Sequence, residues 1–139
     1  NPTPEVTNPM KPVVDLRSRI LQTRTIKKGM SAGYAAAHVF EAPTTIATVA
    51  IGYADGLPRS GSGRVKFYYK GQACPVLGRI SMDVTIIDVG HLKDKPQEGE
   101  WVEILGENQN VDALAADCGT IGYEILTSLG ARHGRIYKN

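Results

Sequence analysis

The sequence predicts a mainly β domain whose few helices are short and lie late in the chain. Apolar, β-branched segments recur at intervals of about 8–12 residues, separated by turn residues, which is the pattern of an antiparallel β fold. Strands do not alternate with long helical segments, which argues against a doubly wound parallel sheet. A length of 139 residues is sufficient for one domain with its own hydrophobic core.

The first two strands are expected at residues 13–26 and 44–52. Residues 13–26 (VVDLRSRILQTRTI) alternate only partly between apolar and polar side chains, but β-branched residues gather at the end of the segment. Residues 44–52 (TTIATVAIG) form a continuous β-branched apolar run, which is typical of a strand buried on both faces.

The middle of the chain predicts a hairpin and two further strands. Residues 65–69 and 73–77 flank a short turn at residues 69–72 that contains a glycine. Residues 83–89 (DVTIIDV) and 101–105 (WVEIL) have the composition of strands, and the segment between them is charged and contains Pro and Gly.

Helical periodicity first appears after residue 110. Residues 111–118 (VDALAADC) predict a helix that Asp112 caps and Gly119 ends. Residues 123–129 predict a second short helix, and residues 135–137 predict a last strand.

Composition and charge exclude several classes of protein. Lys and Arg number 16 and Asp and Glu number 14, and this net charge of +2 is too small for a nucleic-acid-binding or anionic-membrane surface. The longest apolar run, near residues 46–54, is too short to cross a bilayer. The chain begins without a signal-peptide pattern and without Met, so we expect a piece of a longer protein.

The cysteines and histidines predict neither a disulfide framework nor a metal site. Cys74 and Cys118 form no CxxC motif, so two free thiols in a cytoplasmic protein are expected. His38, His91 and His133 have no metal-ligand spacing to one another or to the cysteines.

Three tyrosines adjoin glycines and are candidates for a functional site. Tyr34, Tyr53 and Tyr123 each follow a glycine, where the backbone can turn sharply and approach a ligand. They could equally be ordinary amphipathic residues with packed rings and wet hydroxyls. The segment at residues 78–83 (GRISMD) allows a loop whose N–H groups meet a carboxylate or phosphate, or a plain β-turn with an Arg–Asp contact.

Four motifs together resemble one family. They are KKGMSAGYAAAH at residues 27–38, IGYADGLPR at residues 51–59, GRISMD at residues 78–83 and IGYE at residues 121–124. In this order and at these separations they resemble the C-terminal domain of alanine racemase, from about residue 12 to the end of the chain.

The resemblance implies a fold, a reaction and an assembly. Residues 12–139 would form a Greek-key-like β-barrel domain with one or two short helices near its C-terminus, and residues 1–11 an arm from a preceding barrel domain. That absent domain would bind pyridoxal 5'-phosphate through its lysine, so the chain alone is expected to be inactive. The family acts on alanine, providing D-alanine for peptidoglycan, as a head-to-tail homodimer with shared active sites.

The resemblance also implies roles for single residues. Tyr34 would be the catalytic acid or base at the substrate Cα, although Ala35 stands where glycine is usual. Met82 would hold the substrate carboxylate through its backbone N–H, and Tyr53 would narrow the substrate entrance. Tyr123 would hydrogen-bond the cofactor phosphate of its own chain, whereas the other three residues would serve the partner's site. The outer entryway would include Arg59, Arg79 and Ile121.

Three other functions stay open at this stage. A related decarboxylase for basic amino acids would carry a cysteine motif in its β domain, and Cys74 lies in an ordinary predicted strand. A serine-preferring or broad-specificity racemase would differ mainly in its barrel domain. A non-catalytic interaction module would scatter its tyrosines over the surface, whereas a racemase domain would bring Tyr34, Tyr53 and Met82 to one edge.

Overall fold

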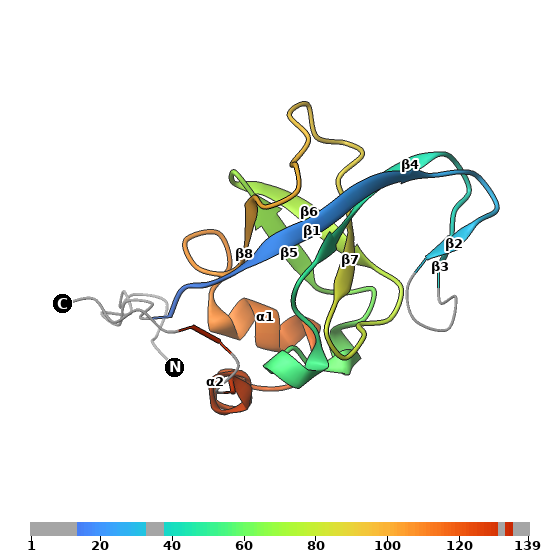
Figure 1. The fold of residues 1–139 in the computed structure, drawn as a ribbon. Helices are drawn as coiled ribbons and strands as arrows, with labels where there is room; N and C mark the ends of the chain where they lie inside the picture. Colours follow the sequence, from blue (N-terminus) through green and yellow to red (C-terminus); the bar gives the residue numbers. More distant parts are fainter. Residues whose placement is uncertain (1–13, 33–37, 131–132, 135–139) are drawn as a thin grey trace, which may run out of the picture.

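The structure is a computed structural model that describes residues 14–32, 38–130 and 133–134. Within these residues the main feature is a closed ring of six antiparallel strands, with two short helices at one end (Figure 1). The ring contains β1 (Leu16–Ile26), β4 (Thr44–Val49), β5 (Lys66–Tyr69), β6 (Gln72–Leu77), β7 (Thr85–Asp88) and β8 (Trp101–Leu105). The mainly β fold predicted from the sequence is confirmed.

The order of strands around the ring is β1-β4-β7-β6-β5-β8. Strands β5, β6 and β7 follow one another, and β8 then returns to lie beside β5, which is the connection of a Greek key. Because β1 pairs with both β4 and β8, the ring closes, and its strands have no free edge in the closed part.

Strand β1 extends beyond the barrel, and this explains why apolar and polar side chains alternate only weakly along it. Its first half pairs with β8 and its second half with β4, with shifts of register after Leu16 and between Ile20 and Gln22. Side chains 21–25 are exposed, because this half of the strand runs outward beyond the ring. A second small hydrophobic cluster forms there from Ile26, Phe40 and Ile46.

Beyond that outward end lies a pairing that the sequence did not predict. Strands β2 (Ser31–Ala32) and β3 (His38–Val39) form a two-stranded sheet of their own. Each has only two residues, too few to show a period-2 pattern.

The hairpin of β5 and β6 follows the prediction closely. Tyr69 pairs with Gln72 across a two-residue turn in which Lys70 has φ 48° and Gly71 has φ 80°. Positive φ at both central residues is the signature of a type I′ turn, whose twist suits an antiparallel pair. Gly71 is therefore the residue that specifies this hairpin.

Helices α1 (Val111–Asp117) and α2 (Gly122–Ser128) lie below the strands in Figure 1. The predicted capping residue was wrong. Asn110, not Asp112, is the N-cap of α1, and its side chain accepts the Ala113 N–H at 2.8 Å. Gly119 follows the helix with φ 70°, as its predicted role at the end requires.

Asn110→Ala is expected to lower the free energy of unfolding by about 1 kcal/mol, because the Ala113 N–H loses its acceptor. Asn110→Ser keeps an acceptor at this position and is the matched control. Urea denaturation of both variants measures the difference. Equal stability of the two variants would contradict the capping role.

The main core fills the ring and continues between the ring and the helices. Leu114, Ala115 and Ile125 of the helices join Phe67, Ile87 and the other buried residues of the strands in a single cluster. Two predictions fall outside the described residues, the arm at residues 1–11 and the strand at residues 135–137. Within the described residues no helix is long and apolar enough to cross a membrane.

Candidate functional site

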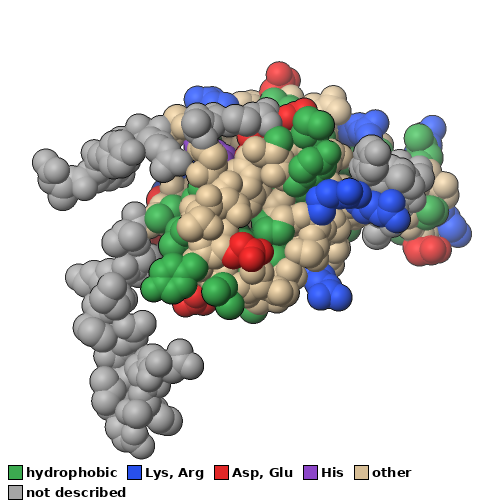
Figure 2. Space-filling model, turned by 90° about the horizontal axis from the view of Figure 1, so that it is seen from below, with side chains coloured by type: hydrophobic (Ala, Val, Ile, Leu, Met, Phe, Trp, Pro, Cys, Tyr) green, Lys and Arg blue, Asp and Glu red, His purple; other side chains and the backbone are tan. Residues whose placement is uncertain are grey.

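Two loops at the helical end of the barrel carry most of the candidate residues. One loop contains the single-turn 3-10 helices η1 (Tyr53–Asp55) and η2 (Arg59–Gly61). The other connects β6 to β7 and contains Ser81 and Met82. Figure 2 views this end of the molecule and shows hydrophobic side chains on the surface with Lys and Arg side chains nearby.

The structure brings Tyr53 and Met82 together. The Tyr53 N–H donates to the Ser81 carbonyl at 2.9 Å, and the Ala54 N–H donates to the Met82 carbonyl at 3.0 Å. Tyr53 is 41% exposed and Met82 is 52% exposed, so both side chains stand at the surface of a backbone that is held by hydrogen bonds.

The Met82 N–H has no hydrogen-bond acceptor among the described residues. Its neighbours are anchored, since the Ser81 N–H donates to the Val84 carbonyl at 3.1 Å and the Ile80 N–H donates to the Ser62 hydroxyl at 2.9 Å. A fixed N–H donor in a half-exposed residue can bind an anionic oxygen without reorganisation of the loop.

Gly52 allows close contact between the two loops, which is not the role that the sequence predicts for it. A Cβ at this position would lie 2.2 Å from the Ser81 oxygen and 2.4 Å from the Met82 oxygen. From the sequence, a glycine beside a tyrosine predicts a close approach of the backbone to a ligand. At Gly52 the close approach is instead to the loop that carries Met82.

The turn that carries Tyr53 is also fixed from its other side. The buried Asp55 carboxylate accepts the Gly52 N–H at 3.0 Å and so closes η1 at its start. The Asp55 carbonyl lies 2.6 Å from Nε2 of His133. A Cβ on Gly56 would lie 2.4 Å from the Ser128 carbonyl, so the end of α2 packs directly against the turn.

Arg59 lies near the Tyr53 ring, and Arg79 is exposed in the other loop. The Arg59 guanidinium carbon lies 5.7 Å from the centre of the Tyr53 ring, within the range of a cation–π contact. Arg79 precedes the buried Ile80 in the loop that carries Met82. Both arginines therefore belong to the two loops that hold Tyr53 and Met82.

Tyr123 and Ile121 form a second exposed pair at the start of α2. They are 79% and 65% exposed, the two most exposed large hydrophobic residues in the described part of the chain. Gly122, which lies between them, packs closely against α1, since a Cβ there would lie 2.6 Å from the Asp112 carboxylate. No described residue takes the Tyr123 hydroxyl as a hydrogen-bond partner.

Tyr34, the predicted catalytic residue, lies outside the described residues. The convergence of Tyr34, Tyr53 and Met82 on one edge is therefore established only for the last two. The sequence singles out His133 only as a possible metal ligand and Asp55 only as part of the IGYADGLPR motif. No local pattern links these two residues, which are 78 positions apart.

The two cysteines are buried free thiols, as predicted. Burial raises the pKa of Cys74 and of Cys118 to about 11. At neutral pH both thiols are therefore protonated, and neither is activated as a nucleophile.

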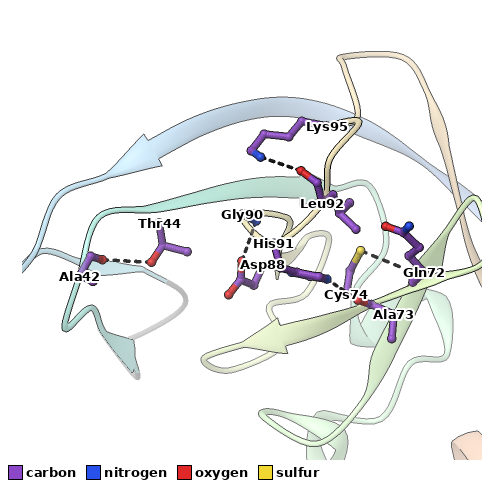
Figure 3. A network of polar contacts seen from close by, with 10 residues as sticks. All are labelled: Ala42, Thr44, Gln72, Ala73, Cys74, Asp88, Gly90, His91, Leu92 and Lys95. Atoms are coloured by element: carbon purple, nitrogen blue, oxygen red, sulfur yellow. Dashed lines mark hydrogen bonds and ion pairs between the residues drawn. The ribbon is translucent and has the colours of Figure 1, made fainter.

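A second group of polar residues lies at the opposite end of β7 (Figure 3). There Nε2 of His91 lies 2.7 Å from the Ala73 carbonyl, the Gly90 N–H donates to Asp88, and the Lys95 ammonium donates to the Leu92 carbonyl. The Asp88 and Lys95 side chains bind backbone groups in the loop after β7, whereas His91 ties this loop to the backbone of β6. No set of three or more His, Cys, Asp or Glu side chains within residues 14–32, 38–130 and 133–134 could hold a metal ion.

Comparison with known proteins gives matches along almost the whole chain. The family model described as alanine racemase, C-terminal domain, matches residues 13–137. The alanine racemase of Acidiphilium cryptum is 48% identical over 141 residues, covering 100% of this chain and 39% of that protein. A catabolic alanine racemase of Rhizobium johnstonii is 48% identical over 132 residues, covering 94% of this chain and 35% of that protein.

Solved structures agree with these matches. The crystal structure of alanine racemase from Bartonella henselae, with covalently bound pyridoxal phosphate, superimposes with a TM-score of 0.88 at 44% identity and covers 89% of this chain and 34% of that chain. The biosynthetic alanine racemase from Pseudomonas aeruginosa has a TM-score of 0.85 at 36% identity, covering 90% of this chain and 35% of that one. The chain thus spans little more than a third of the length of these relatives.

Proposed function

Since the chain belongs to the alanine racemase family and matches its C-terminal domain, we propose that it contributes a catalytic tyrosine and a substrate-carboxylate contact to the racemisation of alanine. The product, D-alanine, would serve peptidoglycan synthesis. In this proposal the chain works as part of a longer enzyme that holds pyridoxal 5'-phosphate in another domain.

The observation that carries the proposal is the Met82 N–H, which has no acceptor among the described residues. An amino-acid substrate presents a carboxylate, and a backbone N–H in a fixed loop is a suitable donor to it. Because the backbone supplies the contact, the Met82 side chain is incidental to binding.

Tyr53 and Arg59 would shape the approach to this donor. The backbone at Tyr53 is held beside Ser81 and Met82 by the hydrogen bonds between the two loops, and the Tyr53 ring would narrow the entrance to the substrate site. Arg59 over the ring and Arg79 in the neighbouring loop place two positive charges along the route, which favours entry of a substrate with a carboxylate. Ile121 would line the outer entryway.

The residues of the chain fit the proposed cofactor at one position. The exposed Tyr123 hydroxyl, without a partner in the described part of the chain, could donate to a phosphate oxygen. When bound, pyridoxal phosphate supplies an electron sink for the charge left on Cα as its proton departs. The lysine that binds the cofactor would come from the domain outside this chain.

Tyr34 would transfer the proton on one face of the substrate Cα. Racemisation needs proton-transfer groups on opposite faces, because the proton leaves from one side and returns from the other. An isolated tyrosine has a pKa near 10, so surrounding residues would have to favour the phenolate at neutral pH.

We further propose a homodimer in which Tyr34, Tyr53 and Met82 complete the partner's site and Tyr123 completes the site of its own chain. The high exposure of Tyr53, Met82, Ile121 and Tyr123 supports surfaces that other polypeptide covers.

Tyr53→Ala in the full-length enzyme is expected to raise the KM for alanine about tenfold with a smaller change in kcat, because the ring contacts substrate in the ground state and the transition state alike. Steady-state kinetics in both directions, L- to D-alanine and the reverse, measure this. Tyr68→Phe, on strand β5, is the control and should leave both constants unchanged. Absence of racemisation by the unaltered enzyme would overturn the proposed function, and an unchanged KM would overturn the role of Tyr53.

A further inference from the structure

We propose that His133 is a positioning residue for Tyr53, acting through the Asp55 carbonyl. The expected effect on KM rests on the proposed function. The contact between His133 and the turn does not depend on that function. The residue lies after α2, and its contact with the turn joins segments 78 positions apart in sequence.

The direction of the hydrogen bond follows from its chemistry. A backbone carbonyl can only accept, so Nε2 of His133 must carry the proton at the 2.6 Å separation. Both the Nε2-protonated neutral ring and the charged imidazolium can donate this bond. The contact therefore does not depend on whether His133 is charged.

The carbonyl that His133 binds belongs to the last residue of η1. In η1 the Gly56 N–H already binds the Tyr53 carbonyl, while the Asp55 carbonyl lies at the C-terminal end, where helical hydrogen bonds run out. Asp55 is buried, and His133 is half-buried. Loss of the bond would remove the contact that ties this end of the turn to the segment after α2, which favours a shift of the turn.

Such a shift would reach Tyr53 directly. Tyr53 and Asp55 belong to the same single-turn helix, which is clamped between the Ser81–Met82 backbone on one side and Ser128 with His133 on the other. The Tyr53 side chain is 41% exposed and lies near Arg59, so the position of its ring depends on the backbone that carries it. His133 would thus set the width of the substrate entrance without contacting substrate.

The test compares His133→Leu, which removes the donor, with His133→Gln, whose side-chain amide can still donate to the carbonyl, in the full-length holoenzyme. His133→Leu is expected to raise the KM for alanine about fivefold with kcat within about twofold of the unaltered enzyme, and His133→Gln to restore most of the affinity. In a Tyr53→Ala background, His133→Leu should add little, because the group it positions is gone.

His91→Leu is the matched control. His91 makes the same type of contact, Nε2 to a backbone carbonyl at 2.7 Å, at the opposite end of β7 (Figure 3). Its removal is expected to leave KM unchanged even where it lowers the melting temperature. The comparison of the two variants separates a positioning effect of His133 from a general loss of stability.

Amide hydrogen exchange gives a readout that does not need activity. In His133→Leu the amides of Tyr53 and Ala54 are expected to exchange faster, while those of strand β7 keep their rates. If the unaltered enzyme failed to racemise alanine, the proposed function would fall, and exchange would still decide whether His133 holds the turn. Unchanged exchange, or an increase in KM that persists fully in the Tyr53→Ala background, would overturn the inference.

Discussion

Tyr34→Phe in the full-length enzyme is expected to lower kcat for alanine racemisation by about 10²–10⁴, the usual contribution of a positioned proton-transfer group. The substitution keeps the aromatic ring and removes only the hydroxyl. If Tyr34 were merely a packed aromatic residue, the change would cost about 1 kcal/mol of stability and leave turnover intact.

Isotope exchange adds a test whose outcome a loss of stability in the variant cannot reproduce. With one proton-transfer group removed, one enantiomer of alanine should still exchange its α-hydrogen with deuterium from solvent, while its conversion to the other enantiomer is slow. Tyr68→Phe serves again as the control. Wild-type rates of exchange for both enantiomers in Tyr34→Phe would remove this residue from the mechanism.

Gly52→Ala is expected to lower the free energy of unfolding by about 3 kcal/mol, because the new methyl group would overlap two backbone carbonyl oxygens that cannot move as a side chain can. The same collision would push apart the loops that carry Tyr53 and Met82. We therefore expect a raised KM for alanine in whatever fraction of the enzyme folds. Denaturant unfolding and steady-state kinetics measure the two effects.

Gly134→Ala is the matched control, since a Cβ there meets no described atom within 4 Å. It should leave the free energy of unfolding and the kinetic constants close to those of the unaltered protein. Equal stability of Gly52→Ala and Gly134→Ala would show that the two loops can separate at little cost, and the close packing at Gly52 would then have no energetic role.

Local chemistry predicted strand β4 and the hairpin of β5 and β6 well. The β-branched run of β4 and the glycine after Lys70 each specify their structure within a few residues, so sequence alone suffices. The cap of α1 was misplaced by two residues because Asn110 and Asp112 are both good N-caps, and only the geometry decides between them.

The site was predicted less completely because its support is non-local. The motif containing Tyr53 and the motif containing Met82 were identified separately, and the hydrogen bonds that join them cross 28 positions of sequence. The bond from His133 to Asp55 crosses 78 positions and has no periodic or compositional signal. Strand β1 is likewise predicted only weakly from its sequence. Its second half lies outside the barrel, where burial does not impose an alternation of apolar and polar side chains.

The position of β1 between β4 and β8 has a consequence for the synthesis of the domain on the ribosome. Strand β4 ends at Val49 and β8 ends at Leu105, so about 56 further residues must emerge before the first half of β1 finds its partner. At the usual rate of translation this takes roughly 3–11 s. During that interval the nascent chain presents an open strand edge, the kind of surface that pairs with other chains and that chaperones protect. The first strand of the ring to be synthesised thus waits for the last strand of the ring before both of its edges are paired.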